Sequence, residues 1–306
     1  MPQLTLTGPP LLPPLLARGA LLSPCKSRRL PRTAARHGDG TVGRLDRLVL
    51  PGVRIDLAHL AAYERVCGFP TGEDAVPLTY PHVLGFPLAM RIMSGRDFPL
   101  PLLGLVHTSI EITRRRRLPA TGEYELTVYV DGLTPHRRGT EATVVTEVRD
   151  TGGECGGDEI AWESRSAYLA RHRVDDAPSL TDGSRPPASA PLPVLAEWRL
   201  GADVGRRYGA VSGDRNPIHL HPLGARLFGF PRAIAHGMWT VARCLAEHGT
   251  PPAALVRAEF RAPVPLPSTV TYAADGRPGG DFALRGTDRK GGQRVHVTGS
   301  VYPLIQ

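Results

Sequence analysis

The 306-residue sequence contains few cysteines, and their spacing argues against two kinds of cross-link. The four cysteines stand far apart and form no C-x-x-C pair. A disulfide framework and a structural zinc site both need paired cysteines at short, regular spacing. We therefore expect free thiols in a reducing cytoplasm, and no structural metal ion.

Long apolar runs, lysines and aromatic residues are also scarce. No run of 18 apolar residues occurs, so we expect no membrane span. The net charge of +8 comes from arginines, because Lys26 and Lys290 are the only lysines, and aromatic residues make up 6% of the chain. These arginines are not interleaved with aromatic side chains, which argues against nucleic-acid binding. A basic surface still attracts anions, such as the phosphates of CoA or an acidic carrier protein.

The first 44 residues differ from the rest of the sequence. Their basic residues stand against a single acid, Asp39, as in an organellar transit peptide. The prolines at 9, 10, 13 and 14 argue against an amphipathic helix there. For residues 1–44 we expect a leader that is poorly ordered or packed at the periphery.

The remaining sequence divides into two halves with the same order of elements. Residues 174–193 are rich in Pro, Ser, Asp and Gly, which is typical of a linker between domains 45–173 and 194–306. Each half has a helix, a long apolar helix and then about four strands. The predicted helices are 56–67, 83–94, 202–212 and 234–248, and the predicted strands are 104–113, 122–131, 140–149, 159–170, 254–262, 268–275, 281–287 and 293–303.

A weak internal repeat supports this duplication. Residues 108–130 and 256–274 share a strand, a basic residue, a Leu-Pro pair, a polar turn and a second strand. A long apolar helix must be covered, and the concave face of a curved antiparallel sheet can cover it. We predict an α+β double hot-dog fold, two tandem sheets each wrapped around an apolar helix. An α+β sandwich and two unrelated small domains are the alternatives.

The segment 208–238 holds most of the chemically informative residues. Residues 212–217 are consecutive turn formers, so the helix before them ends in an irregular loop, where catalytic groups are common. Asp214, Asn216 and His219 place a carboxylate, an amide and an imidazole within six residues. His236-Gly237-Met238 lies where the apolar helix begins, and a helix N-terminus offers unpaired N–H donors and a positive dipole end.

These residues resemble a known family. Asp-x-Asn-Pro-x-His at 214–219, then Gly229-Phe230, His236-Gly237-Met238 and Phe260-x-x-Pro-Val, resembles the motif of MaoC-like dehydratases and (R)-specific enoyl-CoA hydratases. The close similarity covers about residues 203–265. It implies reversible hydration of 2-enoyl thioesters to (R)-3-hydroxyacyl thioesters in fatty-acid metabolism, with CoA or a carrier protein as the handle and no cofactor. It also implies an acid/base pair of Asp214 and His219, an orienting role for Asn216 and an oxyanion donor in the Gly237 N–H.

Other residues of the segment are candidates for contact with the substrate, and each has a simpler structural reading. Tyr208, Ser212 and Met238 fit helix packing, His236 fits a role in positioning the helix start, and the arginines fit solvated surface. The first half lacks the Asp-x-Asn-Pro-x-His loop, although His82 lies near the start of its apolar helix, as His236 does in the second half. We therefore expect a catalytically silent first half that accommodates the acyl chain. The candidates are Tyr208, Ser212, Phe230, Arg232, His236, Met238 and Arg261.

Two other functions fit a hot-dog fold. A thioesterase needs a carboxylate that activates water against the thioester carbonyl, and the 214–219 loop does not match that pattern. A non-catalytic acyl-thioester-binding subunit has no need for both Asp214 and His219. The sequence leaves open the acyl chain length, CoA against carrier protein, and monomer against homodimer.

Overall fold

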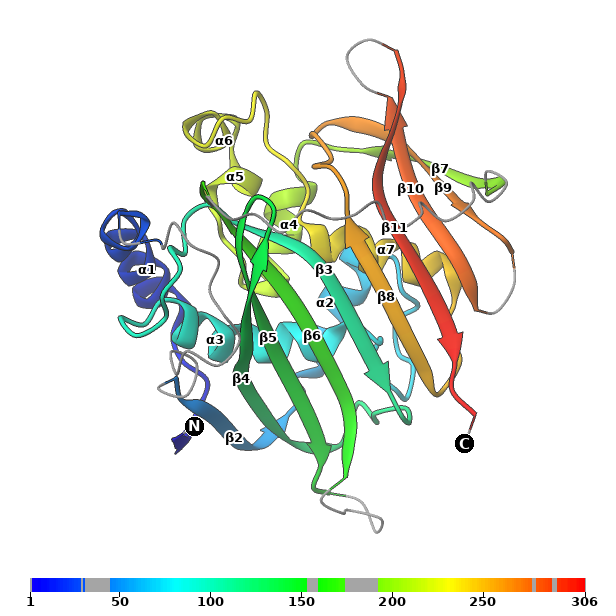
Figure 1. Ribbon diagram of the computed structural model, residues 1–306. Coiled ribbons are helices and arrows are strands. Elements are labelled where there is room, and N and C mark those ends of the chain that lie inside the picture. Colours follow the sequence, from blue (N-terminus) through cyan, green and yellow to red (C-terminus); the bar gives the residue numbers. More distant parts are fainter. Residues whose placement is uncertain are drawn as a thin grey trace.

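One continuous sheet of eleven strands organises the computed structural model, which describes residues 2–28, 30, 45–152, 159–173, 192–276, 279–287 and 291–305 (Figure 1). The strand order is β1-β2-β4-β5-β6-β3-β8-β11-β10-β9-β7. The strands are β1 Gln3–Thr5, β2 Arg47–Arg54, β3 Leu105–Arg114, β4 Glu123–His136, β5 Gly139–Asp150, β6 Ile160–Arg171, β7 Val194–Leu200, β8 Ala254–Phe260, β9 Ser268–Ala274, β10 Gly280–Thr287 and β11 Gln293–Pro303.

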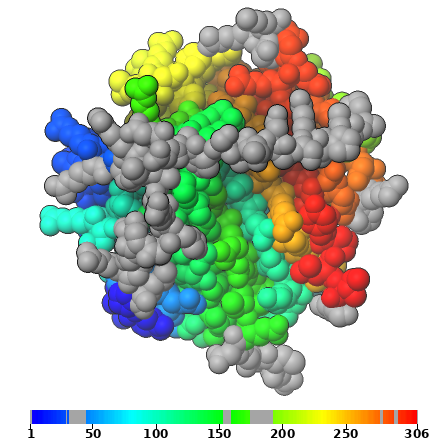
Figure 2. Space-filling model, viewed as in Figure 1, coloured from blue at the N-terminus to red at the C-terminus, as the bar shows by residue number. Residues whose placement is uncertain are grey.

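The two halves of the chain repeat the same sheet in mirrored order. The order β2-β4-β5-β6-β3 in the first half corresponds to β7-β9-β10-β11-β8 in the second half. β3 and β8 pair antiparallel from Ser109 opposite Glu259 to Arg114 opposite Ala254, which joins the halves. Figure 2 shows the first-half strands (green) beside the second-half strands (orange and red) on one face. This topology matches the predicted duplication.

Helices α2, α3, α4 and α7 lie behind the sheet in the view of Figure 1. The apolar helices α3 and α7 bury most of their side chains, and Trp239 of α7 donates its indole N–H to the carbonyl of Val66 in α2, at 3.0 Å. Asp56 caps α2, since its carboxylate accepts from the N–H groups of Ala58 and His59. None of the described helices is long and apolar enough to cross a membrane. The helices are α1 Leu12–Ser27, α2 Leu57–Cys67, α3 Tyr80–Met93, α4 Val204–Ser212, α5 Pro217–Leu220, α6 Pro222–Leu227 and α7 Gly237–His248.

The prediction that prolines prevent a helix near the N-terminus was wrong. Helix α1 contains Pro13 and Pro14 in its first turn, where backbone N–H groups have no helical partner and a proline loses nothing. Ser23 accepts from the Leu103 N–H at 2.9 Å, and the Lys26 ammonium donates to the Gly95 carbonyl at 2.6 Å. This part of the predicted leader is therefore packed. Residues 29 and 31–44, and the linker residues 174–191, lie outside the described residues.

Candidate active site

The loop that carries Asp214 lies close against helix α4, because α4 presents glycines to it. α4 ends at Gly213, which has a φ of 76°. A Cβ atom on Gly205 would lie 2.0 Å from the carbonyl oxygen of His219, and one on Gly209 would lie 2.9 Å from that of Asp214. Real Cβ atoms do not approach that closely, so only glycine permits this packing. Both proposed catalytic residues are thereby held against one helix.

Short hydrogen-bonded turns fix the loop itself. The Asp214 N–H donates to the Ser212 hydroxyl at 3.2 Å, and the Asn216 N–H donates to Oδ1 of Asp214 at 3.2 Å. Oδ1 of Asn216 accepts from the Ile218 N–H at 3.3 Å and caps the short helix α5. The predicted orienting role of Asn216 thus has a geometric basis, and Ser212 contributes to the same turn.

Two histidines meet beside Asp214. His219 donates from Nδ1 to the Ile234 carbonyl at 2.8 Å, which leaves Nε2 as the lone-pair nitrogen of the neutral ring. His236 donates from Nε2 to the backbone carbonyl of Asp214 at 2.9 Å, and the same nitrogen lies 3.8 Å from Oδ2 of Asp214. The two imidazole rings stack with centroids 3.7 Å apart.

Burial keeps both imidazoles neutral. The pKa of His219 is lowered by burial, against the opposing effect of the Asp214 charge. Burial, and then the neighbouring His219, lower the pKa of His236 to about 3. At neutral pH the site therefore presents a carboxylate and an uncharged imidazole nitrogen, both hydrogen-bond acceptors. The Asp214 side chain is 31% exposed, so its carboxylate is open to solvent on one side, whereas His219 is buried.

Gly237 is the first residue of α7, so no helical carbonyl reaches its N–H group. The segment before it pairs with the Pro-Val part of the Phe260-x-x-Pro-Val motif: Ala235 donates to the Val264 carbonyl at 2.9 Å, and Leu266 donates to that of Ala233 at 2.8 Å. This pairing explains why α7 begins at 237 rather than at the predicted 234. A Cβ atom on Gly237 would lie 2.9 Å from the Phe260 ring.

Asp214, His219 and His236 also have the composition of a metal site, since one ligand atom of each lies within 4.8 Å of the others. We propose proton transfer rather than metal binding for this group. Stacked rings direct their in-plane lone pairs side by side rather than to one point, and Nε2 of His236 already donates to a carbonyl.

The structure places the remaining candidates around this group or apart from it. Tyr208 is buried, with its ring 4.9 Å from that of His236, and Met238 lies in the core. Phe230 donates its N–H to the Ala225 carbonyl, Arg232 donates to the Pro267 carbonyl at 3.4 Å, and Arg261 pairs with Glu259. Contact of Phe230, Arg232 and Arg261 with a substrate stays a prediction.

His82 lies near the start of its apolar helix, as predicted, but its position does not correspond to that of His236. The bond from Val76 N–H to the Leu118 carbonyl is the counterpart of the bond from Ala235 to Val264, so Pro77 corresponds to His236. His82 instead lies in the first turn of α3, where the charge of Asp214 opposes the burial that lowers its pKa to about 4.

Sequence reasoning missed two further residues of the first half, His107 and Tyr168. Their rings stack with centroids 4.5 Å apart, and the Asp214 charge adds to the burial that raises the pKa of Tyr168. No motif or periodicity marks either position, because each gains its place only through strand pairing.

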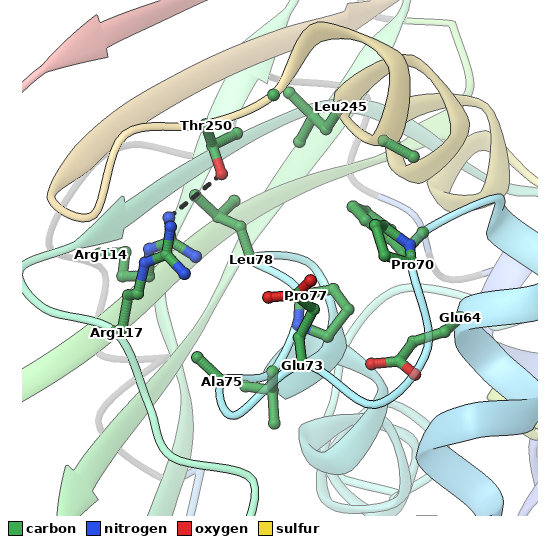
Figure 3. A pocket seen from close by; sticks show the side chains of 14 residues that line it. Glu64, Pro70, Glu73, Ala75, Pro77, Leu78, Arg114, Arg117, Leu245 and Thr250 are labelled. Atoms are coloured by element: carbon green, nitrogen blue, oxygen red, sulfur yellow. Dashed lines mark hydrogen bonds between the residues drawn. The ribbon is translucent and has the colours of Figure 1, made fainter.

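A separate cavity of about 220 Å³ lies near the other end of α7 (Figure 3). Its wall includes Glu64, Glu73, Arg114 and Leu245. Arg114 donates to the Thr250 hydroxyl at 3.1 Å and to the Pro251 carbonyl at 2.6 Å. Its guanidinium therefore links β3 to the loop that precedes β8. Leu245 lies eight residues after Gly237, about 12 Å along the helix axis. This cavity is distinct from the group around Asp214.

Comparisons with known proteins identify relatives of this chain. The family described as "MaoC like domain" matches residues 184–276. The curated 3-hydroxyacyl-thioester dehydratase X of Mycobacterium tuberculosis is 40% identical over 237 residues, which cover 76% of this chain and 81% of that protein.

Solved structures confirm the predicted double hot-dog fold. The crystal structure of HtdX from M. tuberculosis superposes with a TM-score of 0.70 at 35% identity, covering 84% of this chain and 100% of that one. A second M. tuberculosis protein, described as having a double hotdog fold, reaches a TM-score of 0.50 at 12% identity over 82% of this chain and 92% of that one, which shows likeness of fold alone. The chain therefore belongs to the MaoC-like 3-hydroxyacyl-thioester dehydratases.

Proposed function

We propose that this chain catalyses reversible hydration of 2-enoyl thioesters to (R)-3-hydroxyacyl thioesters. The observation that carries the proposal is that the Asp214 carboxylate and a ring nitrogen of His219 lie within 4.8 Å of each other, and that His236, whose ring stacks on His219, directly precedes the Gly237 N–H at the start of α7. A water molecule between the two acceptors would donate one hydrogen bond to each and direct its oxygen at C3 of the enoyl group.

In the proposed reaction the Asp214–His219 pair takes up one proton and gives up one proton. The water oxygen bonds to C3 while one of its protons passes to the Asp214–His219 pair, and C2 receives a proton from that pair. Negative charge that develops on the thioester oxygen is stabilised by the Gly237 N–H, a kind of interaction worth about 2.7–4 kcal/mol of barrier. Dehydration is the same path in reverse.

For the thioester handle we propose CoA or an acidic carrier protein. Arg232 and Arg261 remain the proposed contacts, and both are exposed beside the segments that hold the start of α7. Cys25, Cys67 and Cys244 are free thiols, which supports a reducing cytoplasm as the location.

Purified protein with crotonyl-CoA tests the function. A hydratase removes the enoyl absorbance and yields (R)-3-hydroxybutyryl-CoA on chiral analysis, a thioesterase releases free thiol, and a binding subunit does neither. Release of thiol without loss of the enoyl group, or the (S) product, would contradict the proposal.

The roles of the pair are tested by Asp214→Asn and His219→Ala. Each variant should lower kcat by roughly 100- to 10,000-fold, because general acid–base catalysis by a positioned group contributes that much. The matched control is His221→Ala, an exposed histidine two residues further on, which should keep near-normal activity. Circular dichroism checks that all three variants fold, and near-wild-type turnover of either catalytic variant would refute its role.

A further inference from the structure

A cluster of polar rings from the first half lies beside the proposed catalytic group. His107 ends the regular pairing of β3 with β6, opposite Tyr168, and a bulge follows at Thr108. Bulges near active sites often redirect a side chain. The His107 ring lies 4.7 Å from the ring of Phe260, which itself abuts Gly237, and 6.1 Å from the ring of His82 in α3. The Phe260 ring therefore lies between the cluster and Gly237, whose N–H is the proposed oxyanion donor.

The cluster has unused hydrogen-bonding capacity. Nδ1 of His82 and Nε2 of His107 are buried and find no partner among the described residues. A buried polar atom without a partner costs on the order of 1–3 kcal/mol. The three residues as a whole are only partly buried. Because a half-turn of an imidazole exchanges a carbon for a nitrogen, each histidine ring can turn its unpaired nitrogen toward a ligand.

The polarity of this wall does not fit a plain hydrocarbon chain. An acyl group that extends past Phe260 would meet two imidazoles and a phenol, and an alkyl chain would leave the unpartnered nitrogens of His82 and His107 without a hydrogen bond. Because burial lowers the pKa of both histidines, each stays neutral and offers one donor and one acceptor. A hydroxyl or carbonyl oxygen on the acyl chain supplies the missing partner.

We propose that His82, His107 and Tyr168 form a polar acyl subsite that selects 2-enoyl thioesters bearing a hydroxyl or carbonyl oxygen on the acyl chain beyond the double bond. This inference rests on the proposed hydratase function. It makes the first half of the chain a determinant of substrate specificity, although the catalytic pair belongs to the second half.

The test compares matched substrates on the wild-type protein. The kcat/KM values for 2-hexenoyl-CoA, 5-hydroxy-2-hexenoyl-CoA and 5-oxo-2-hexenoyl-CoA are measured side by side. We expect about tenfold or greater preference for an oxygenated substrate, the factor that corresponds to one hydrogen bond of about 1.4 kcal/mol. Equal turnover of all three would overturn the subsite. Turnover of none would overturn the proposed function instead.

Variants then assign the preference to the cluster. His82→Leu, His107→Phe and the mild Tyr168→Phe, which removes one oxygen, should each reduce several-fold the ratio of kcat/KM for the oxygenated substrates to kcat/KM for 2-hexenoyl-CoA. The control is His248→Phe, since His248 also has an unpartnered Nε2 but pairs with Tyr272 at the far end of α7. An undiminished preference in all three cluster variants, or its loss in the control alone, would overturn the assignment.

Discussion

A single backbone contact determines what His219 can do. The Ile234 carbonyl accepts the Nδ1 proton at 2.8 Å, so the neutral ring keeps its lone pair on Nε2, the nitrogen that a substrate water would meet. Burial disfavours the charged form, and the Asp214 carboxylate only partly offsets that effect on the pKa. Folding therefore prepares this histidine as a base rather than as a cation.

This state of His219 predicts a displaced pH profile. Protonation of Nε2 removes the acceptor, and because the pKa of His219 is lowered from its usual 6.5, the acid limb of kcat/KM for crotonyl-CoA should lie below pH 6.5. In Asp214→Asn the limb of the residual activity should move further toward acid, because the charge that raises this pKa is gone. A profile whose acid limb falls at or above pH 6.5 would contradict the assignment of the base.

The residues that sequence could predict are those that lie together in one short segment. Asp214, Asn216 and His219 stand within six positions, and their turn chemistry is local. The Ile234 carbonyl, His107 and Tyr168 contribute through contacts between distant segments. No local pattern encodes which strand residue faces which, so these three were beyond prediction.

At the scale of elements, helix α4 and the loop after it act as one unit. Gly205 lies against the His219 carbonyl with no room for a methyl group. Gly205→Ala should push the loop away from α4, lower kcat/KM at least tenfold, and cost about 1–3 kcal/mol of unfolding free energy through overpacking. Steady-state kinetics and urea denaturation measure the two effects.

The matched control for that change is Gly8→Ala, because a Cβ atom at Gly8 meets nothing within 4 Å. The control should leave both measurements unchanged. Wild-type kinetics in Gly205→Ala would show that the loop does not depend on this close approach.

Most elements were predictable because their apolar residues recur with helical or alternating spacing. The strands β1, β2 and β7 and the short helices α5 and α6 were not predicted. Three further departures have physical causes. α1 was missed because Pro13 and Pro14 were read as helix breakers although they lie in its first turn. α7 starts later than predicted because Ala235 is held by Val264, and β4 runs on to His136 because β5 pairs with it to the end.

At the scale of the whole molecule, the halves are joined by more than the strand pairing of β3 with β8. Glu111 and Arg257 face each other across that junction and form an ion pair at 2.6 Å, and Arg114 of β3 binds the loop that precedes β8. The polar cluster and the catalytic group meet at the same junction. We therefore expect the described parts of both halves to unfold together.

Buried neutral histidines should make this unfolding sensitive to acid. Burial lowers the pKa of six histidines below 6.5, so below that pH the unfolded chain binds more protons than the folded chain. The contribution of these neutral histidines to the free energy of unfolding is fully present above pH 6.5 and is lost as the pH falls. The six are His82, His107, His219, His236, His248 and His296.

Urea denaturation at pH 7.5 and 5.5 tests this, with His236→Phe as the informative variant. His236 is 2% exposed and its pKa is about 3, so it should stay neutral in the folded chain throughout this range. Its share of the stability lost between the two pH values is therefore about 1.4 kcal/mol, the equivalent of one pKa unit. His236→Phe should lose about that much less than wild type, whatever its stability at pH 7.5. The exposed-site control His221→Gln should lose as much as wild type, and an unchanged loss in His236→Phe would mean that this ring is already charged in the folded protein.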